Sequence, residues 1–161
     1  MLSGLQDFLF AKPELKRFSN APKSQKLIVF YSEGSGYWTH FKPILEALSQ
    51  YNDLVCSYLT SERTDPILLN PPNGVEPYYI GERTIRTVCF AGLEADMVVM
   101  TMPNLHTSYI KRSPYVRKYI YVHHSLVSQH MIYRSEAFDN FDVIFCAGNH
   151  HIEETRKRER Q

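Results

Sequence analysis

The chain has 161 residues, of which 43% are hydrophobic and 13% aromatic, a composition typical of one globular domain with its own core. Its formal net charge of +1 provides no overall basis for binding nucleic acid. No apolar stretch approaches the roughly 18 residues that span a bilayer, and the N-terminus lacks the pattern of a signal peptide. We therefore expect a soluble, cytoplasmic domain.

Residues 1–25 differ from the rest and are interpreted as an N-terminal extension. Apolar residues alternate there with lysines and arginines, and Pro13 and Pro22 interrupt the segment. The composition favours a short helix packed on the domain and followed by a linker. The other possibility is a segment that contacts a membrane surface, which would make the protein peripheral at the inner face of the membrane.

From residue 26 onward, short apolar runs alternate with helical patterns, which predicts a parallel sheet wrapped by helices. The first run, KLIVFY at 26–31, is typical of a strand buried on both faces. Further strands are predicted at 53–59, 77–80, 95–102, 118–123 and 141–146. Helices are predicted from about His40 to Leu48, at 82–93 and at 150–161. Pro43 suits the first of these helices if it lies in the first turn.

This alternation predicts the fold class: α/β, a Rossmann-like doubly wound parallel sheet in the order 3-2-1-4-5-6, spanning 26–161. Cys56, Cys89 and Cys146 fall in separate predicted elements, inside apolar runs and without a CxxC pattern. They are expected to be free, buried thiols. The histidines lack a metal-binding spacing, so neither a metal site nor a cofactor is expected.

A glycine loop, Glu33-Gly34-Ser35-Gly36, follows the first predicted strand. Backbone N–H groups in this position can face an anion, although the glycines can equally serve only to form a tight turn. The loop is not G-x-G-x-x-G, and Thr60 rather than an acidic residue ends the second predicted strand. A nicotinamide-dependent enzyme is therefore not expected.

His123 and His124 end the fifth predicted strand, and a polar loop begins at Ser125. Ligands of open α/β sheets bind beyond the carboxyl ends of the strands, and a histidine near neutral pKa can accept a proton from a hydroxyl. The alternative is a histidine that only hydrogen-bonds a loop. Because neighbouring residues on a strand point to opposite faces, only one of the two rings can face a given cleft.

Two segments carry a resemblance to a known family. Residues 34–48, GSGYWTHFKPILEAL, are similar to the glycine loop, proline and helix that follow the first strand of many GT-B glycosyltransferases. Residues 119–126, YIYVHHSL, resemble the strand that ends in a Trp-His-Gly-Thr motif in the CDP-glycerol glycerophosphotransferases of teichoic-acid synthesis. His123, Ser125 and Leu126 replace the Trp, Gly and Thr, and only the histidine, at His124, is retained.

The resemblance implies the N-terminal, acceptor-side half of a GT-B transferase. His124 would be the catalytic base, with His123 turned away from its cleft. Gly34, Ser35, Gly36, His123 and Ser125 are the candidates for acceptor and cleft binding.

The implied acceptor is a polyol phosphate or a glycan. The implied nucleotide-linked donor would bind to a C-terminal domain or partner subunit that these residues do not contain, so the isolated chain is expected to be inactive. A stand-alone Rossmann-like binding or interaction module without catalysis remains the alternative.

Overall fold

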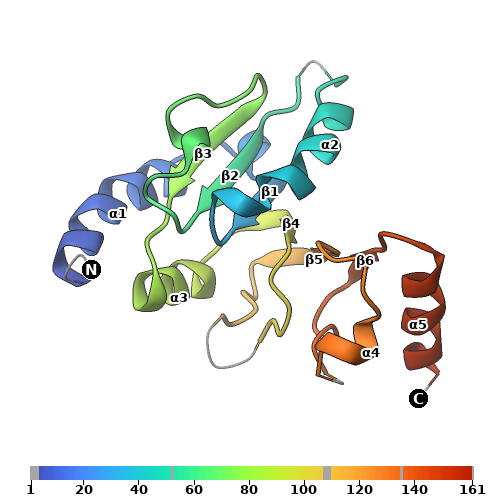
Figure 1. Cartoon of the computed structure of the whole chain (residues 1–161). Coiled ribbons are helices and arrows are strands. Elements are labelled where there is room, and N and C mark those ends of the chain that lie inside the picture. The colour runs from blue at the N-terminus through green and yellow to red at the C-terminus, as the bar shows by residue number, and fades with distance from the viewer. Residues whose placement is uncertain (1–3, 52, 107–109, 135, 161) are drawn as a thin grey trace.

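The computed structural model describes residues 4–51, 53–106, 110–134 and 136–160, and its centre is a six-stranded, wholly parallel sheet (Figure 1). The strands are β1 (Ile28–Ser32), β2 (Cys56–Thr60), β3 (Val75–Tyr79), β4 (Ala95–Met100), β5 (Val116–Val122) and β6 (Val143–Phe145). Their spatial order is β3-β2-β1-β4-β5-β6, which confirms the predicted order.

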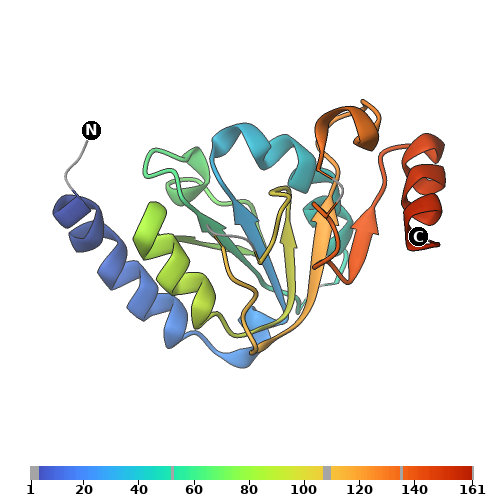
Figure 2. The ribbon, with the colours of Figure 1, turned by 90° about the horizontal axis from the view of Figure 1, so that it is seen from below.

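Helices cover both faces of the sheet, as a doubly wound fold requires. They are α1 (Gly4–Ser19), α2 (Trp38–Leu48), α3 (Arg83–Ala91), α4 (Gln129–Ile132) and α5 (Asn149–Glu159), with short 3-10 turns at Lys23–Lys26, Ser35–Tyr37 and Pro66–Leu68. On one face Tyr31 of β1 packs against Phe90 of α3, and α1 lies beside α3 (Figure 2). On the other face Phe30 packs against Phe41 of α2.

Strand boundaries differ from the predicted ones by up to three residues. The difference that matters for function is at β5, which ends at Val122, so that His123 and His124 follow the strand. The N–H of His123 still donates to the carbonyl of Phe145, at 3.1 Å, and extends the ladder to β6 by one bond. The histidine pair is therefore held at the carboxyl edge of the sheet.

The start of α2 corrects the predicted one. The helix begins at Trp38, two residues before His40, so Pro43 lies in the second turn and not in the first. Proline has no N–H to donate to the carbonyl four residues earlier, here that of Thr39. Thr39 is exposed, so solvent can satisfy its carbonyl group, which makes the proline tolerable.

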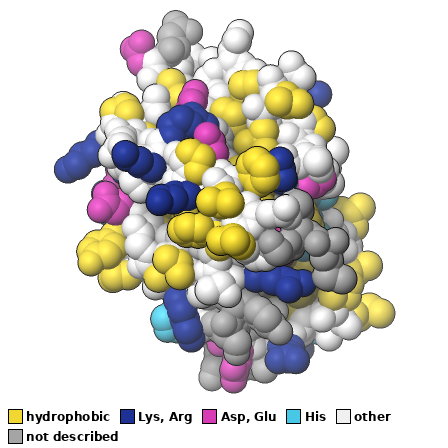
Figure 3. Space-filling view, turned by 90° about the vertical axis from the view of Figure 1, so that its left-hand side faces the viewer, with side chains coloured by type: hydrophobic (Ala, Val, Ile, Leu, Met, Phe, Trp, Pro, Cys, Tyr) yellow, Lys and Arg dark blue, Asp and Glu magenta, His cyan; other side chains and the backbone are white. Residues whose placement is uncertain are grey.

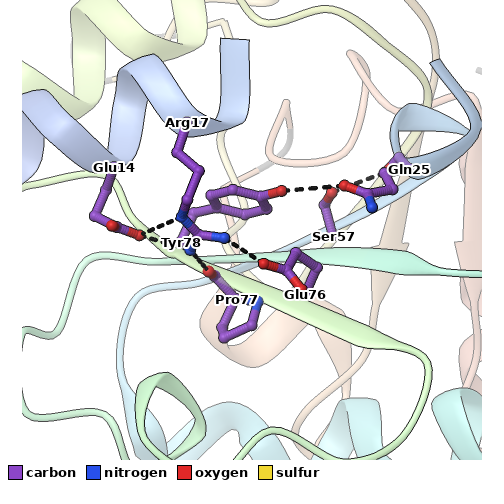
Figure 4. Close-up of polar contacts among 7 residues, drawn as sticks. All are labelled: Glu14, Arg17, Gln25, Ser57, Glu76, Pro77 and Tyr78. Carbon is purple, nitrogen blue, oxygen red and sulfur yellow. Dashed lines mark hydrogen bonds and ion pairs between the residues drawn. The ribbon is translucent and has the colours of Figure 1, made fainter. Parts of the chain in front are cut away.

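The N-terminal helix α1 packs on the domain, the arrangement that its composition favoured, and it continues through Pro13 instead of breaking there. Its main attachment is Arg17, whose guanidinium lies 4.0 Å from the ring centroid of Tyr78 on β3 (Figure 4). The same guanidinium donates to Glu14, to Glu76 and to the carbonyl of Pro77. Residues 1–25 thus include an integral layer of the fold over β3.

A second attachment lies nearer the N-terminus of α1. The carboxylate of Asp7 accepts a hydrogen bond from the hydroxyl of Tyr79 and another from the N–H of Glu82, the latter at 3.1 Å. Asp7 therefore links α1 to the end of β3 and to the residue before α3. This contact fixes the chain at the edge where the loops after β1, β2 and β3 meet.

The outer side of α1 carries exposed apolar side chains, which lie among lysines and arginines on the face in Figure 3. They are Leu5, Phe8 and Leu9, whereas the partly exposed ring of Phe10 lies against the guanidinium of Arg63 on the side of β3. Contact of this surface with a membrane stays a prediction. Among the described residues, no helix combines the length and the apolar character needed to cross a bilayer.

All three cysteines are free thiols, as predicted. Cys56 is buried, while Cys89 and Cys146 are partly buried. Burial raises the pKa of the Cys56 thiol to about 11 and that of Cys89 to about 12. Because the reactive species of a cysteine is the thiolate, these two side chains are packing groups, not nucleophiles.

Candidate functional site

The candidate site lies at the carboxyl edge of the sheet, where the ends of all six parallel strands meet. Three segments at this edge carry the predicted residues or contact them. They are residues 33–37 after β1, 61–65 after β2 and 123–128 after β5. Each segment connects a buried strand to the next element, so its backbone is positioned by the core below it.

His124 is half-buried beside the start of α2. Its ring centroid lies 5.5 Å from that of Tyr37 and 5.9 Å from that of His40, and both neighbouring rings meet it edge to face. Its Nδ1 lies 3.4 Å from the hydroxyl oxygen of Tyr121. His124 thus faces the helix that follows the glycine loop, which is the side that strand alternation predicts for it.

The hydrogen bonds of Tyr121 favour one tautomer of His124. The Tyr121 hydroxyl donates its single hydrogen to the hydroxyl of Tyr133, 3.2 Å away. Its oxygen is then available to accept Nδ1–H of His124, which leaves Nε2 without a proton. None of the described residues hydrogen-bonds to that nitrogen. The ring therefore presents a free basic nitrogen at the edge of the sheet.

The surroundings keep the His124 ring neutral. Burial lowers its pKa below the usual histidine value, and positive charge on His40 lowers that pKa further. Both effects disfavour the imidazolium form. At neutral pH the side chain is thus ready to accept a proton, which is the property a general base needs.

His123 lies on the opposite face and does not line a cleft. Its side chain is only 6% exposed, and its ring stacks on that of His151 of α5, with centroids 4.1 Å apart. Nε2 of His123 lies 3.1 Å from the side-chain nitrogen of Gln129, while its buried Nδ1 has no hydrogen-bond partner. Helix α5 covers the ring, and a role of His123 in ligand binding stays a prediction.

The glycine loop binds an anion, but the anion belongs to the protein. The N–H of Ser35 donates to the carboxylate of Glu62, which follows β2, at 2.6 Å. A Cβ on Gly34 would come within 2.9 Å of the same carboxylate oxygen. The hydrogen bonds from Ser35 lower the pKa of Glu62, so the carboxylate is ionised and occupies the N–H that was expected to face a ligand.

Gly36 and Ser125 have other positions. Gly36 is exposed, and a Cβ there would meet no atom within 4 Å, so the site does not require its small size. The hydroxyl of Ser125 accepts from the N–H of Val127 at 3.4 Å, which shapes the loop after His124. The structure therefore brings His124 together with α2, while Ser35 of the glycine loop is hydrogen-bonded to Glu62.

Sequence reasoning missed the residues that surround His124. Tyr37 and His40 are three residues apart at the start of α2, so they share one helix face, and this spacing was a usable signal. Tyr121 lies inside the fifth predicted strand, 118–123, where nothing in the sequence distinguishes it from a packing residue. Tyr133 carries no sequence signal because it reaches the site only through the loop after α4. Within the described residues, His, Cys, Asp and Glu form no group of three or more that could hold a metal ion.

The chain matches no protein-family model, no curated protein and no solved structure. The parallel fold and the chemistry of its carboxyl edge are therefore the basis for assigning a function.

Proposed function

We propose that this chain is the acceptor-binding domain of a GT-B transferase similar to the CDP-glycerol glycerophosphotransferases. Such an enzyme transfers glycerol phosphate, or a sugar, from a CDP- or UDP-linked donor to an acceptor hydroxyl. The observation that carries the proposal is His124: a neutral imidazole with a free Nε2 at the carboxyl edge of a Rossmann-like sheet. His124, which follows β5, also occupies the position of the histidine in the Trp-His-Gly-Thr motif that residues 119–126 resemble.

In the proposed reaction, Nε2 of His124 accepts the proton of the acceptor hydroxyl. As that proton leaves, the acceptor oxygen forms a bond to the β-phosphorus of CDP-glycerol, and the bond from this phosphorus to the bridging oxygen breaks, releasing CMP. The protein contributes mainly position and charge, as is usual in phosphoryl transfer. Tyr121 holds the His124 ring through Nδ1 and so keeps Nε2 directed away from the strand.

The partners of this domain follow from the same proposal. The acceptor is a polyol phosphate or a glycan, and the nucleotide-linked donor binds outside these 161 residues, in a C-terminal domain or a partner subunit. Neither nucleic acid nor a bound cofactor enters the reaction. The occupied N–H of Ser35 supports the placement of the donor elsewhere, because the glycine loop has no free cradle for a diphosphate at that position.

The test is a transfer assay on the longest natural protein that carries this sequence. CDP-glycerol and a glycerol-phosphate oligomer are supplied, and CMP release and oligomer extension are measured. His124→Ala is expected to lower kcat by about 10²- to 10⁴-fold, because it removes general-base catalysis. The KM for CDP-glycerol should remain within about twofold, because the donor is bound by other residues.

The matched control is His130→Ala, since His130 is an exposed histidine in α4. It should retain activity within about twofold of the unmodified protein. If His124→Ala retains activity within a fewfold while folding normally, His124 is not the base. If the unmodified protein neither releases CMP nor extends the oligomer, the transferase proposal fails.

The second candidate is a binding or interaction module without chemistry. It is favoured by one observation, the closure of the glycine loop on Glu62, which leaves His124 as the main reactive group of the predicted set. The same assay separates the two candidates, because a module gives no CMP release under any condition.

A further inference from the structure

A hollow lies at the carboxyl edge, beside the loops that follow β1, β2 and β3. It has a volume of about 300 Å³ and is separate from the rings around His124. We call it the Arg86 pocket. Its lining residues are Glu33, Ser61, Glu62, Glu82, Arg83 and Arg86.

Arg86 is a largely buried cation whose hydrogen bonds are incomplete. Its side chain is 16% exposed, and Nη1 donates to the hydroxyl of Tyr31 at 3.2 Å. The carboxylate of Glu33 lies 3.9 Å away, beyond hydrogen-bond distance. The Nε atom is buried and has no partner. A guanidinium offers five N–H donors, so the part of Arg86 that lines the pocket can donate to an oxygen atom bound there.

The acidic residues of the pocket differ in protonation. Glu62 is held ionised by its hydrogen bonds from Ser35. Burial raises the pKa of Glu33, and the charge of Arg86 only partly opposes that effect. Glu33 is therefore protonated more readily than Glu62, and in its protonated form it can donate as well as accept a hydrogen bond.

The formal charge of the lining argues against an anionic ligand. Three carboxylates and two guanidinium groups give a net charge of 2 − 3 = −1 when all are ionised. Such a surface repels free phosphate but suits hydroxyl groups. A hydroxyl can accept from a guanidinium N–H and donate to a carboxylate at the same time. The hydroxyl of Ser61, which lies 3.2 Å from that of Tyr31, extends this polar floor.

We propose that the Arg86 pocket binds an uncharged, hydroxyl-rich unit, a polyol or a sugar ring. This inference rests on the proposed function and identifies the ligand as the unit of the acceptor next to the one that reacts. The glycine loop connects the two places. The N–H of Ser35 donates to Glu62, which lines the pocket, and Tyr37, two residues after Ser35, contacts the ring of His124. An acceptor bound in the pocket can thus extend past Tyr37 to the base.

The experiment is a titration of this chain, labelled with ¹⁵N, with glycerol, with methyl glucoside and, separately, with inorganic phosphate. The Nε–H signal of Arg86 and the backbone signals of Ser61 and Glu62 are followed by NMR. Glycerol or methyl glucoside should shift all three signals in a saturable way. Arg86→Lys retains the charge but removes the planar set of guanidinium donors, and it should weaken binding about five- to tenfold.

The control variants keep the test interpretable. Arg83→Ala alters an exposed residue at the rim and should weaken binding less than Arg86→Lys does. Glu33→Gln retains the size of Glu33 and tests the carboxyl group without removing the buried cation. Each variant is first shown to unfold at the same temperature as the unmodified chain, and if Arg86→Lys does not, Glu33→Gln replaces it, with a loss of about threefold or more expected.

The outcomes separate this inference from the proposed function. His124→Ala should leave polyol binding unchanged. Polyol binding by the unmodified protein without any transfer would support the pocket and contradict the transferase proposal. Shifts caused by phosphate but not by the polyols would overturn the inference, since the site would then be an anion site. The absence of shifts with all three probes would overturn it as well.

Discussion

His123 and His124 are adjacent in the chain, yet the two faces of the sheet give them different environments. On the α5 side, His123 is stacked on His151 and covered. On the α2 side, His124 meets two rings edge to face and keeps one nitrogen free. The difference shows that the position of a histidine at a strand end does not decide its role. What decides it is whether the helix on that face of the sheet covers the ring or leaves part of it exposed.

On the α5 side, hydrogen bonds hold the loop that follows His124. Nδ1 of His151 accepts from the N–H of Ala147 at 3.3 Å, and its Nε2 donates to the carbonyl of Val127 at 2.9 Å. The carboxylate of Glu154 accepts from the hydroxyl of Ser128 and from the N–H of Gln129, at 2.6 and 2.7 Å. Helix α5 therefore fixes residues 127–129, and it stabilises the segment that leads away from the candidate base.

The largest effect on stability is expected from His151→Ala. The side chain is fully buried, and its loss removes the stack on His123 and two hydrogen bonds. We expect the free energy of unfolding to fall by about 2–4 kcal/mol, measured by urea denaturation. His130→Ala, an exposed change, should cost less than about 0.5 kcal/mol. A loss below about 1 kcal/mol for His151→Ala would show that α5 does not seal this side.

The next effect concerns acid stability. Burial lowers the pKa of His123 to about 4, and the charges of His151, His124 and His150 act in the same direction, while Glu154 opposes them. An unfolded histidine titrates near 6.5, so the unfolded chain binds the proton more tightly. The contribution of His123 is complete above pH 6.5 and is lost as the pH falls from there towards 4, with a slope of at most about 1.4 kcal/mol per pH unit.

The measurement is urea denaturation of the unmodified chain and of His123→Phe at several pH values between 7.5 and 4. Phenylalanine preserves the ring stack but cannot be protonated. The variant should therefore lose less stability over this interval than the unmodified chain does, while other acid effects cancel in the comparison. Parallel curves for the two proteins would mean that His123 is not buried in its neutral form.

Much of the fold could be predicted, because each strand has a signal in its own local sequence. Each of the six strands lies within an apolar run or at its margin, and their order follows from the rules for parallel connections. The start of α2 was misplaced because a 3-10 turn, Ser35–Tyr37, leads into it. The attachment of α1 depends on Arg17 and Asp7 meeting side chains about 60 to 75 residues away, which no local pattern reveals.

The candidate site was harder to predict from the sequence, because it too depends on contacts between distant segments. Alternation along β5 correctly separated His123 from His124, because it is a property of the strand itself. Two features of the site depend on how distant segments pack together. They are the stack of His123 on His151 and the hydrogen bond from the N–H of Ser35 to Glu62. Composition cannot show that an N–H group expected to face a ligand is already bound. Residues that complete a site from another loop, such as Tyr133 and Arg86, are found only once the strands are placed.

The smallest expected effect tests the open side of the comparison. His40 lies on the side of His124 that faces α2, and its positive charge helps to lower the pKa of His124. His40→Gln removes that charge while retaining a polar side chain of similar reach, so the pKa of His124 should rise. The measurement is an NMR titration of the ring protons of His124 in the unmodified chain and in the variant.

The direction of this change in the pKa of His124 also predicts a change in activity. A base with a higher pKa becomes protonated at a higher pH, so the acid limb of the kcat profile should move to higher pH in His40→Gln. At pH 8 both proteins should turn over at rates within about twofold, because His124 is neutral in each. His106→Gln serves as the control, since its ring accepts from the N–H of Arg112, away from this edge. If the acid limb does not move although the NMR pKa of His124 rises, the group that limits turnover is not His124. The proposal that His124 is the general base is then contradicted.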